Sequence, residues 1–177
     1  MAKWRGAMEL FDIYDDDRNL TGRTAERNQK LKGGEHQLIV HVNIMNTQNQ
    51  LLIQQRQPHK QDFPGYWDIS VGGGVRAGET SRDAAEREVF EELGLAIDLA
   101  ETVPYFWIHF PNGFADEYIV HQDLELDMLN LQQTEVQNVK WASYDEVMSM
   151  LTEGTFFPYH QSMLELIFSF SKMGEKI

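Results

Sequence analysis

The chain has 177 residues, of which 42% are hydrophobic, and it contains 10 Phe, 6 Tyr and 4 Trp. It is long and apolar enough for a folded core, which excludes a disordered chain. No apolar run approaches the roughly 18 residues of a membrane helix, and the absence of cysteine excludes disulfides and thiolate metal sites. The 28 acidic and 15 basic residues give a formal charge of −13, which disfavours nucleic-acid backbones and anionic membranes as partners.

The organisation of the chain is simple. No apolar stretch follows Lys3 and Arg5, so we read no secretory signal and expect a cytoplasmic protein. No internal repeat and no Pro-, Gly- or Ser-rich linker divides the sequence. We therefore expect a single domain over residues 1–177, with residues 1–7 outside its packed part.

Hydrophobic patterns and turn residues predict the following elements in chain order. The strands are expected at residues 9–14, running into an acidic turn, and at 38–44, 51–57, 66–71, 96–109 and 118–126. Residues 47–50 are expected to form a hairpin turn and residues 72–74 a glycine loop. The helices are expected at 81–93, between Thr80 and Gly94, at 144–151, behind a Ser143/Glu146 capping box, and at 158–172. Because strands and helices do not alternate strictly, we predict an α/β (α+β) fold, a mixed β-sheet with helices packed on it.

The segment over residues 73–95 carries the chemistry. On a helix, Glu88, Glu91 and Glu92 fall within an arc of about 100°. This arc borders an apolar face and holds no basic residue of its own, since Arg87 lies beside the arc rather than within it. Such carboxylates favour a hard divalent cation, Mg²⁺ or Mn²⁺. The alternative is a solvated acidic surface, which is common for glutamate-rich helices.

The wider pattern identifies a family. Gly73, Glu79, Arg87-Glu88, Glu91-Glu92 and Gly94, with aliphatic residues at 89 and 95, match the Nudix box at every position, and the chain therefore resembles the Nudix (MutT-like) hydrolases. A dinucleotide fingerprint, Gly72-x-Gly74-x-x-Ala77 with Asp98 beyond it, competes for the same glycines. That fingerprint leaves the paired glutamates unexplained.

The resemblance implies a fold and a site. It implies a mixed sheet sandwiched between helices, with Glu91 and Glu92 as the leading metal ligands and the Gly73 carbonyl beside them. Glu88 either binds the metal or orients the attacking water, and Arg87 pairs with Glu79 to brace the structure. The implied cofactor is Mg²⁺, with Mn²⁺ able to substitute, and the implied partner is a small-molecule diphosphate. A homodimer is also expected from the resemblance.

Outside the box, residues 9–46 and 51–73 resemble the branch that contains type I isopentenyl-diphosphate isomerase. From that branch, Arg56 and Lys60 are candidates for binding substrate phosphates, and Glu117 is a candidate metal ligand or base from a loop opposite the box helix. The isomerase, however, has a cysteine where this chain has Gly72 and a metal-binding histidine where it has Gly74. Its other metal histidine aligns near Gln29, and only His36 and Glu117 are retained, which makes His36 a packed or hydrogen-bonded residue.

We therefore predict Mg²⁺-dependent hydrolysis of a nucleoside diphosphate derivative or another organic diphosphate, by a metal-activated water that attacks phosphorus. Isomerase-like activity and a non-catalytic diphosphate-binding regulator are the alternatives. The aromatic residues at 67 and 105–107 could stack on a nucleobase, although aromatic runs in strands more often belong to the core.

Overall fold

The computed structural model describes residues 9–173, so the prediction for residues 1–7 falls outside the described range. The strands are β1 (Leu10–Tyr14), β2 (Leu20–Glu26), β3 (Gln37–Met45), β4 (Leu51–Arg56), β5 (Trp67–Asp68), β6 (Val71–Gly74), β7 (Phe106–Phe110), β8 (Gly113–His121) and β9 (Val136–Ala142). The helices are α1 (Ser81–Leu93), α2 (Tyr144–Glu153) and α3 (Gln161–Met173), with a short 3₁₀ turn at Leu126–Met128.

Seven of these strands form one mixed sheet. Its main order is β5-β4-β3-β8-β7, with β6 paired to β3 and β9 paired to β4. The β3–β8 pair is parallel, and the other pairs are antiparallel. β3 and β4 meet only at Met45 and Leu51, because β4 then pairs with β9 and β5 instead. The expected hairpin is therefore paired only next to its turn, and beyond it the two strands pair with different neighbours.

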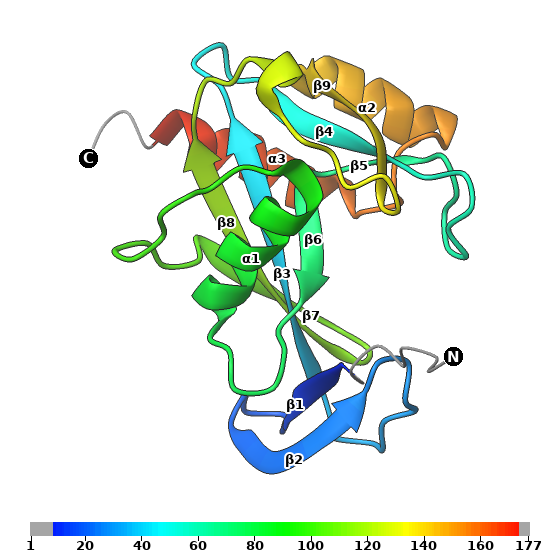
Figure 1. Ribbon diagram of the computed structural model, residues 1–177, viewed down its shortest axis with the longest axis vertical. Coiled ribbons are helices and arrows are strands. Elements are labelled where there is room, and N and C mark those ends of the chain that lie inside the picture. Colours follow the sequence, from blue (N-terminus) through cyan, green and yellow to red (C-terminus); the bar gives the residue numbers. More distant parts are fainter. Residues whose placement is uncertain (1–8, 174–177) are drawn as a thin grey trace, which may run out of the picture.

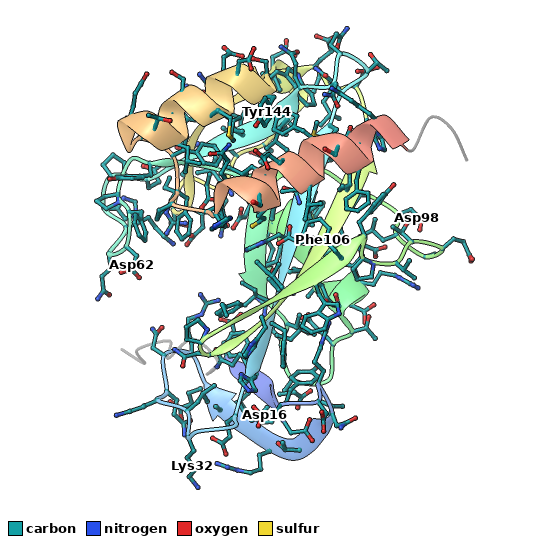
Figure 2. The ribbon with its side chains drawn as sticks, turned by 180° about the vertical axis from the view of Figure 1, so that it is seen from behind. Asp16, Lys32, Asp62, Asp98, Phe106 and Tyr144 are labelled. Atoms are coloured by element: carbon teal, nitrogen blue, oxygen red, sulfur yellow. The ribbon has the colours of Figure 1, made fainter. Side chains whose placement is uncertain are left out.

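Helices cover the two faces of this sheet. α1 lies over β3, β6 and β8, and α2 lies beside β4 and β9 (Figure 1). α3 crosses the opposite face, as the rear view shows (Figure 2). Two apolar clusters fill the spaces between the layers, one including Val89 and Leu93 of α1 and the other Leu164 and Ile167 of α3. The predicted fold, a mixed sheet between helices, is thus confirmed.

The helix α1 begins and ends where the sequence predicts. The Thr80 side chain accepts a hydrogen bond from the Asp83 amide, and the Asp83 carboxylate accepts one from the Thr80 amide, which completes a capping box. Gly94 ends the helix in the left-handed region, with φ of 66°. Ala85, Val89 and Leu93 are fully buried against the sheet. This docking fixes the direction in which the glutamates of the other face point.

Several predicted elements are wrong in extent. Residues 72–74 form β6 rather than a loop, paired with β3 through His41 and Gly72. Of the predicted strand at 96–109, only residues 106–109 lie in a strand, as part of β7. The carbonyls of Ala100 and Thr102 accept hydrogen bonds from Arg82. β8 begins and ends earlier than predicted, at Gly113 and His121, and the last helix begins at Gln161.

The strands β2 and β9 are absent from the prediction. β2 forms with β1 a separate two-stranded sheet, which lies at the lower end of the molecule in Figure 1.

Within residues 9–173, the structure has no helix that is both long and apolar enough to cross a membrane.

Candidate active site

Six of the residues predicted for the site lie around one cavity of about 360 Å³. It is bounded by the box helix α1, the strands β4 and β6, and the segments that flank β1 and β2. The predicted residues in its lining are Arg56, Lys60, Gly73, Glu88, Glu91 and Glu92. The other lining residues are Glu9, Arg27, Gln54, Asp68, Gly72, Arg76, Gln132 and Glu135. The structure therefore brings the box carboxylates and the two predicted phosphate-binding residues together.

Glu88 and Glu92 are held out of water at the base of this cavity. Each is only 7% exposed, and Glu92 accepts a hydrogen bond of 2.8 Å from Gln54 of β4. Burial raises the pKa of Glu92 to about 8, since that bond only partly opposes it and Glu88 adds a like charge. Burial also raises the pKa of Glu88, against the hydrogen bond from Arg87. A cation bound beside these two buried carboxylates would stabilise their ionised forms.

The absence of a side chain at Gly73 leaves room for the carboxylate of Glu88. A Cβ atom built on Gly73 would lie 2.1 Å from Cδ and 2.4 Å from Oε1 of Glu88. Any side chain at this position would therefore displace the carboxylate. The need for glycine here comes from this close approach rather than from an unusual backbone angle, because Gly73 is a regular strand residue opposite Val40.

Contrary to the prediction, basic side chains do reduce the repulsion among the three box glutamates. Arg76, in the loop before α1, contacts Glu91 through two nitrogens at 3.2 and 3.4 Å. Arg87 reaches Glu88 at 2.6 Å and Glu91 at 3.5 Å. The contact of Arg87 with Glu91 follows from their i, i+4 spacing on the helix. The other two contacts do not, since Arg76 lies outside the helix and Arg87 and Glu88 are adjacent in sequence.

Arg87 braces the whole box. It donates two hydrogen bonds to Glu79, at 2.7 and 2.9 Å, and one of 2.9 Å to the carbonyl of Gly74. Its remaining contacts are with Glu88 and, at 3.5 Å, with Glu91. A guanidinium provides these donors in a fixed plane. Arg87 thus ties the loop, the strand β6 and the helix into one unit, as the resemblance implied for its pairing with Glu79.

Arg56 and Lys60 stand on the other side of the cavity and both have acidic partners. Arg56 contacts Asp68 at 3.4 Å and donates to the backbone carbonyl of Asp62. Lys60 pairs with Glu135. Their own stretch of sequence holds no acid before Asp62, so these partners come from elsewhere in the chain. Burial raises the pKa of Asp68, although its hydrogen bond from Tyr159 opposes that effect.

Glu117 is not brought together with the other predicted ligands. It lies within the strand β8 rather than in a loop, is fully buried, and is absent from the cavity lining. Its carboxylate accepts hydrogen bonds of 2.6 Å from His41 and 3.1 Å from Asn43. Burial lowers the pKa of His41, but the charge of Glu117 and this bond outweigh it and raise the pKa overall. His36, as expected, is buried and bonded to Asp16.

The aromatic candidates for nucleobase stacking also lie elsewhere. Within the described part of the chain, the cavity lining includes no aromatic side chain. Trp67 instead packs against the α3 cluster and lies under Lys140, and Phe106 contacts Phe170 of α3. Trp107 lies beneath Arg18, at 4.8 Å from its guanidinium carbon.

Several residues that complete the lining were not predicted from the sequence. Arg76 occupies a variable position of the box, and Gln54 and Asp68 come from short strands without a recognisable motif. Arg76 and Asp68 are charged and lie close in sequence to predicted site residues, and this is the one signal that could have identified them.

The carboxylates do not yet form a closed metal shell. Among residues 9–173, no group of three acidic or histidine side chains is arranged to hold a metal ion. Glu88 faces Arg87, Glu91 faces Arg76 and Arg87, and Glu92 faces Gln54. Both oxygens of Glu91 are bonded to arginines, so a cation on Glu91 would have to compete with Arg76 and Arg87.

Comparisons with known proteins agree with this geometry. The chain matches the NUDIX domain over residues 35–165. It is 45% identical to an uncharacterised Nudix hydrolase of Listeria monocytogenes over 152 residues, 86% of this chain and 90% of that protein. It is 28% identical to an isopentenyl-diphosphate Delta-isomerase of Pectobacterium atrosepticum, over 84% of this chain and 86% of the isomerase.

A solved structure confirms the fold. The crystal structure of a Deinococcus radiodurans protein superposes with a TM-score of 0.73 and 23% identity, over 90% of this chain and 97% of that one. At that identity the likeness concerns the fold alone. The domain match and the Listeria relative, however, extend over most of the chain and include the complete box. The chain therefore belongs to the Nudix hydrolase family, whose members act on pyrophosphate bonds.

Proposed function

We propose that the chain is a Mg²⁺-dependent hydrolase of the diphosphate bond in a nucleoside diphosphate derivative or another organic diphosphate. One observation carries this proposal: three box glutamates and two basic residues, found far apart in sequence, line the same cavity. Glu88, Glu91 and Glu92 would hold the metal, with the Gly73 carbonyl, and Arg56 and Lys60 would bind substrate phosphates.

The donor set fits a hard divalent cation. Carboxylate and carbonyl oxygens are the ligands that Mg²⁺ and Mn²⁺ prefer. The bare backbone at Gly73, which lets the Glu88 carboxylate approach within van der Waals range, supports a ligand role for both residues. When bound, the metal supplies charge neutralisation at the diphosphate and lowers the pKa of a bound water.

The charge of the cavity supports the same conclusion. Its described lining has six carboxylates and four basic side chains, a formal charge of −2. A diphosphate would be repelled from such a cavity, and a single divalent cation would bring the charge to zero. With every acid ionised, the acidity of this site therefore supports a cation between the carboxylates and an anionic substrate.

The residues of the chain have separate tasks in this reaction. Arg56 and Lys60 orient the diphosphate, Arg56 through its planar fork and Lys60 as a point charge. A box carboxylate accepts the proton of the attacking water, a new oxygen–phosphorus bond forms, and the bridging oxygen leaves with the product. Arg87 keeps Glu88 in position through its contact at 2.6 Å.

A panel of diphosphates assayed with Mg²⁺ tests the proposal. We expect release of phosphate or monophosphate from at least one compound, and a loss of about 100-fold or more in Glu92→Gln. Glu101→Gln, at an exposed loop residue outside the cavity, is the matched control. Activity on no compound, or equal activity in Glu92→Gln and Glu101→Gln, would contradict the proposal. Isopentenyl diphosphate belongs in the panel, since its isomerisation would identify the alternative activity.

A further inference from the structure

Basic side chains reach the cavity from two parts of the fold, and the proposed function uses only one of these pairs. Arg56 and Lys60 belong to the end of β4 and the loop that follows it. Arg27 directly follows β2, and Arg76 lies in the loop between β6 and α1. Figure 1 shows the β4–β5 loop at the upper right and the β1–β2 hairpin at the lower end of the molecule. The box glutamates of α1 line the same cavity as both pairs.

Arg27 and Arg76 are held side by side by one carboxylate. Arg27 contacts Oε2 of Glu9 at 2.7 Å, and Arg76 contacts Oε1 of the same residue at 2.7 Å. The guanidinium of Arg27 also lies 5.6 Å from the ring centre of Phe11. Both arginines keep access to water, since their side chains are 61% and 38% exposed. Glu9 thus positions two guanidiniums with donors still directed outward.

The second partner of Arg76 is Glu91, which the proposed function assigns to the metal. A cation on Glu91 would compete with Arg76 for that carboxylate, and Arg27 and Arg76 would then share Glu9 alone. Two arginines on one carboxylate carry a surplus positive charge. A surplus of this kind, in fixed geometry and in reach of water, is what recognises a phosphate.

We propose that Arg27 and Arg76 form a second anion subsite, so that the preferred substrate is an organic diphosphate whose other group carries a phosphate of its own. This inference rests on the proposed function. The diphosphate would lie between the metal carboxylates and Arg56, and the additional phosphate would lie at Arg27 and Arg76. The described lining offers charged and amide side chains but no aromatic ring. The polar, phosphorylated character of the substrate is therefore what this cavity can select.

The alternative role of Arg27 is structural, as a brace between Glu9 and the β1–β2 hairpin. The two roles predict different kinetics. A brace affects every substrate by the same factor, whereas a subsite affects only those compounds that carry the additional phosphate.

Two pairs of probes that differ by a single phosphate separate these roles: NADPH with NADH, and coenzyme A with 3′-dephospho-coenzyme A. For at least one pair, we expect kcat/KM to be about tenfold higher for the phosphorylated member, the range of one charged hydrogen bond at a partly exposed site. Arg27→Gln is expected to bring that ratio close to one, and Arg27→Lys to keep an intermediate ratio, because the charge survives without the fork.

Arg23→Gln is the matched control, since Arg23 lies on β2, pairs with Glu35 and is absent from the cavity lining. It should keep the wild-type ratio. Ratios near one for both pairs in the wild type would overturn the subsite while leaving the proposed function intact. So would an Arg27→Gln variant that slows both members equally. Absence of hydrolysis of every diphosphate would instead contradict the proposed function.

Discussion

The hydroxyl of Tyr159 donates a hydrogen bond of 2.8 Å to Oδ1 of Asp68, and the other carboxylate oxygen of Asp68 contacts Arg56 at 3.4 Å. Tyr159 belongs to the segment between α2 and α3, which also runs beside β5, where the Trp67 amide donates to the Thr155 carbonyl and the Phe157 amide donates to the Trp67 carbonyl. The guanidinium of Arg56 lies 6.0 Å from the ring centre of Phe157. A buried aspartate and the partly buried aromatic residues beside it therefore fix the position of the arginine proposed to bind phosphate.

Tyr159→Phe is expected to raise KM by about threefold to tenfold and to change kcat less, because Asp68 loses the bond that orients it toward Arg56. Steady-state kinetics on the best diphosphate of the panel measures this. Tyr144→Phe is the control, since its hydroxyl bonds Glu165 far from the cavity. If Tyr159 acts through Arg56, the effects of Tyr159→Phe and Arg56→Gln on kcat/KM are not additive. Additive effects would show that Tyr159 acts elsewhere.

Gly73→Ala is expected to weaken Mg²⁺ binding, since the new methyl group would occupy the place of the Glu88 carboxylate. Displacing a ligand or its support costs about 10-fold to 100-fold in metal affinity or activity. Activity measured against Mg²⁺ concentration, together with the Mg²⁺-induced rise in Tm, checks this effect. Gly33→Ala is the control, because no atom lies within 4 Å of its Cβ position. A Gly73→Ala protein with an unchanged Mg²⁺ requirement would exclude Glu88 from the metal site.

Local signals account for the part of the site that sequence could predict. Thr80 and Gly94 bound α1 by direct contacts within one turn, and the helical period then places Glu88 and Glu92 toward the cavity. These are interactions between neighbours in the chain, so a single sequence contains them. The family resemblance, which the domain match confirms, also predicted that Gly73 belongs to the site.

Long-range pairing explains what sequence could not predict. β9 exists because it pairs with β4 across more than 80 residues, and its weakly alternating sequence gives no local sign of this. The burial of Glu117 follows from the parallel register of β8 with β3, which sets it beside His41. Glu9 and Asp68 enter the lining from separate segments. In each case the deciding partner lies far away in the chain.

The Glu117 prediction can be tested directly, because a buried hydrogen-bonded carboxylate and a metal ligand respond differently to removal of charge. Glu117→Gln is expected to lower the free energy of unfolding by about 2–4 kcal/mol, since His41 and Asn43 lose their buried charged partner. Urea unfolding measures this loss. The Mg²⁺ concentration for half-maximal activity should stay the same. An increase in that concentration would return Glu117 to the metal site.

The cap of α2 gives stability a dependence on pH. Glu146 accepts hydrogen bonds of 2.7 Å from the Ser143 amide and 2.9 Å from its hydroxyl, and these bonds lower the pKa of Glu146. Because the pKa is lower in the folded protein than in the unfolded chain, the stabilisation is present above the ordinary glutamate pKa of 4.5 and is lost as the pH falls through the folded pKa. Ser143→Ala should therefore cost about 1 kcal/mol at pH 7 and less at pH 3.

Urea unfolding at the two pH values compares Ser143→Ala with Ser149→Ala. Ser149 lies on the same helix, and its exposed hydroxyl bonds Glu153 without capping the helix. Alanine at position 149 also has the higher helix propensity, so this control should be neutral or slightly stabilising at both pH values. A cost for Ser143→Ala that is equal at pH 3 and pH 7 would mean that the hydroxyl stabilises α2 only through the Glu146 amide. The bond between the Ser143 hydroxyl and the Glu146 carboxylate would then contribute nothing to stability, while the bond from the Ser143 amide persists in both proteins.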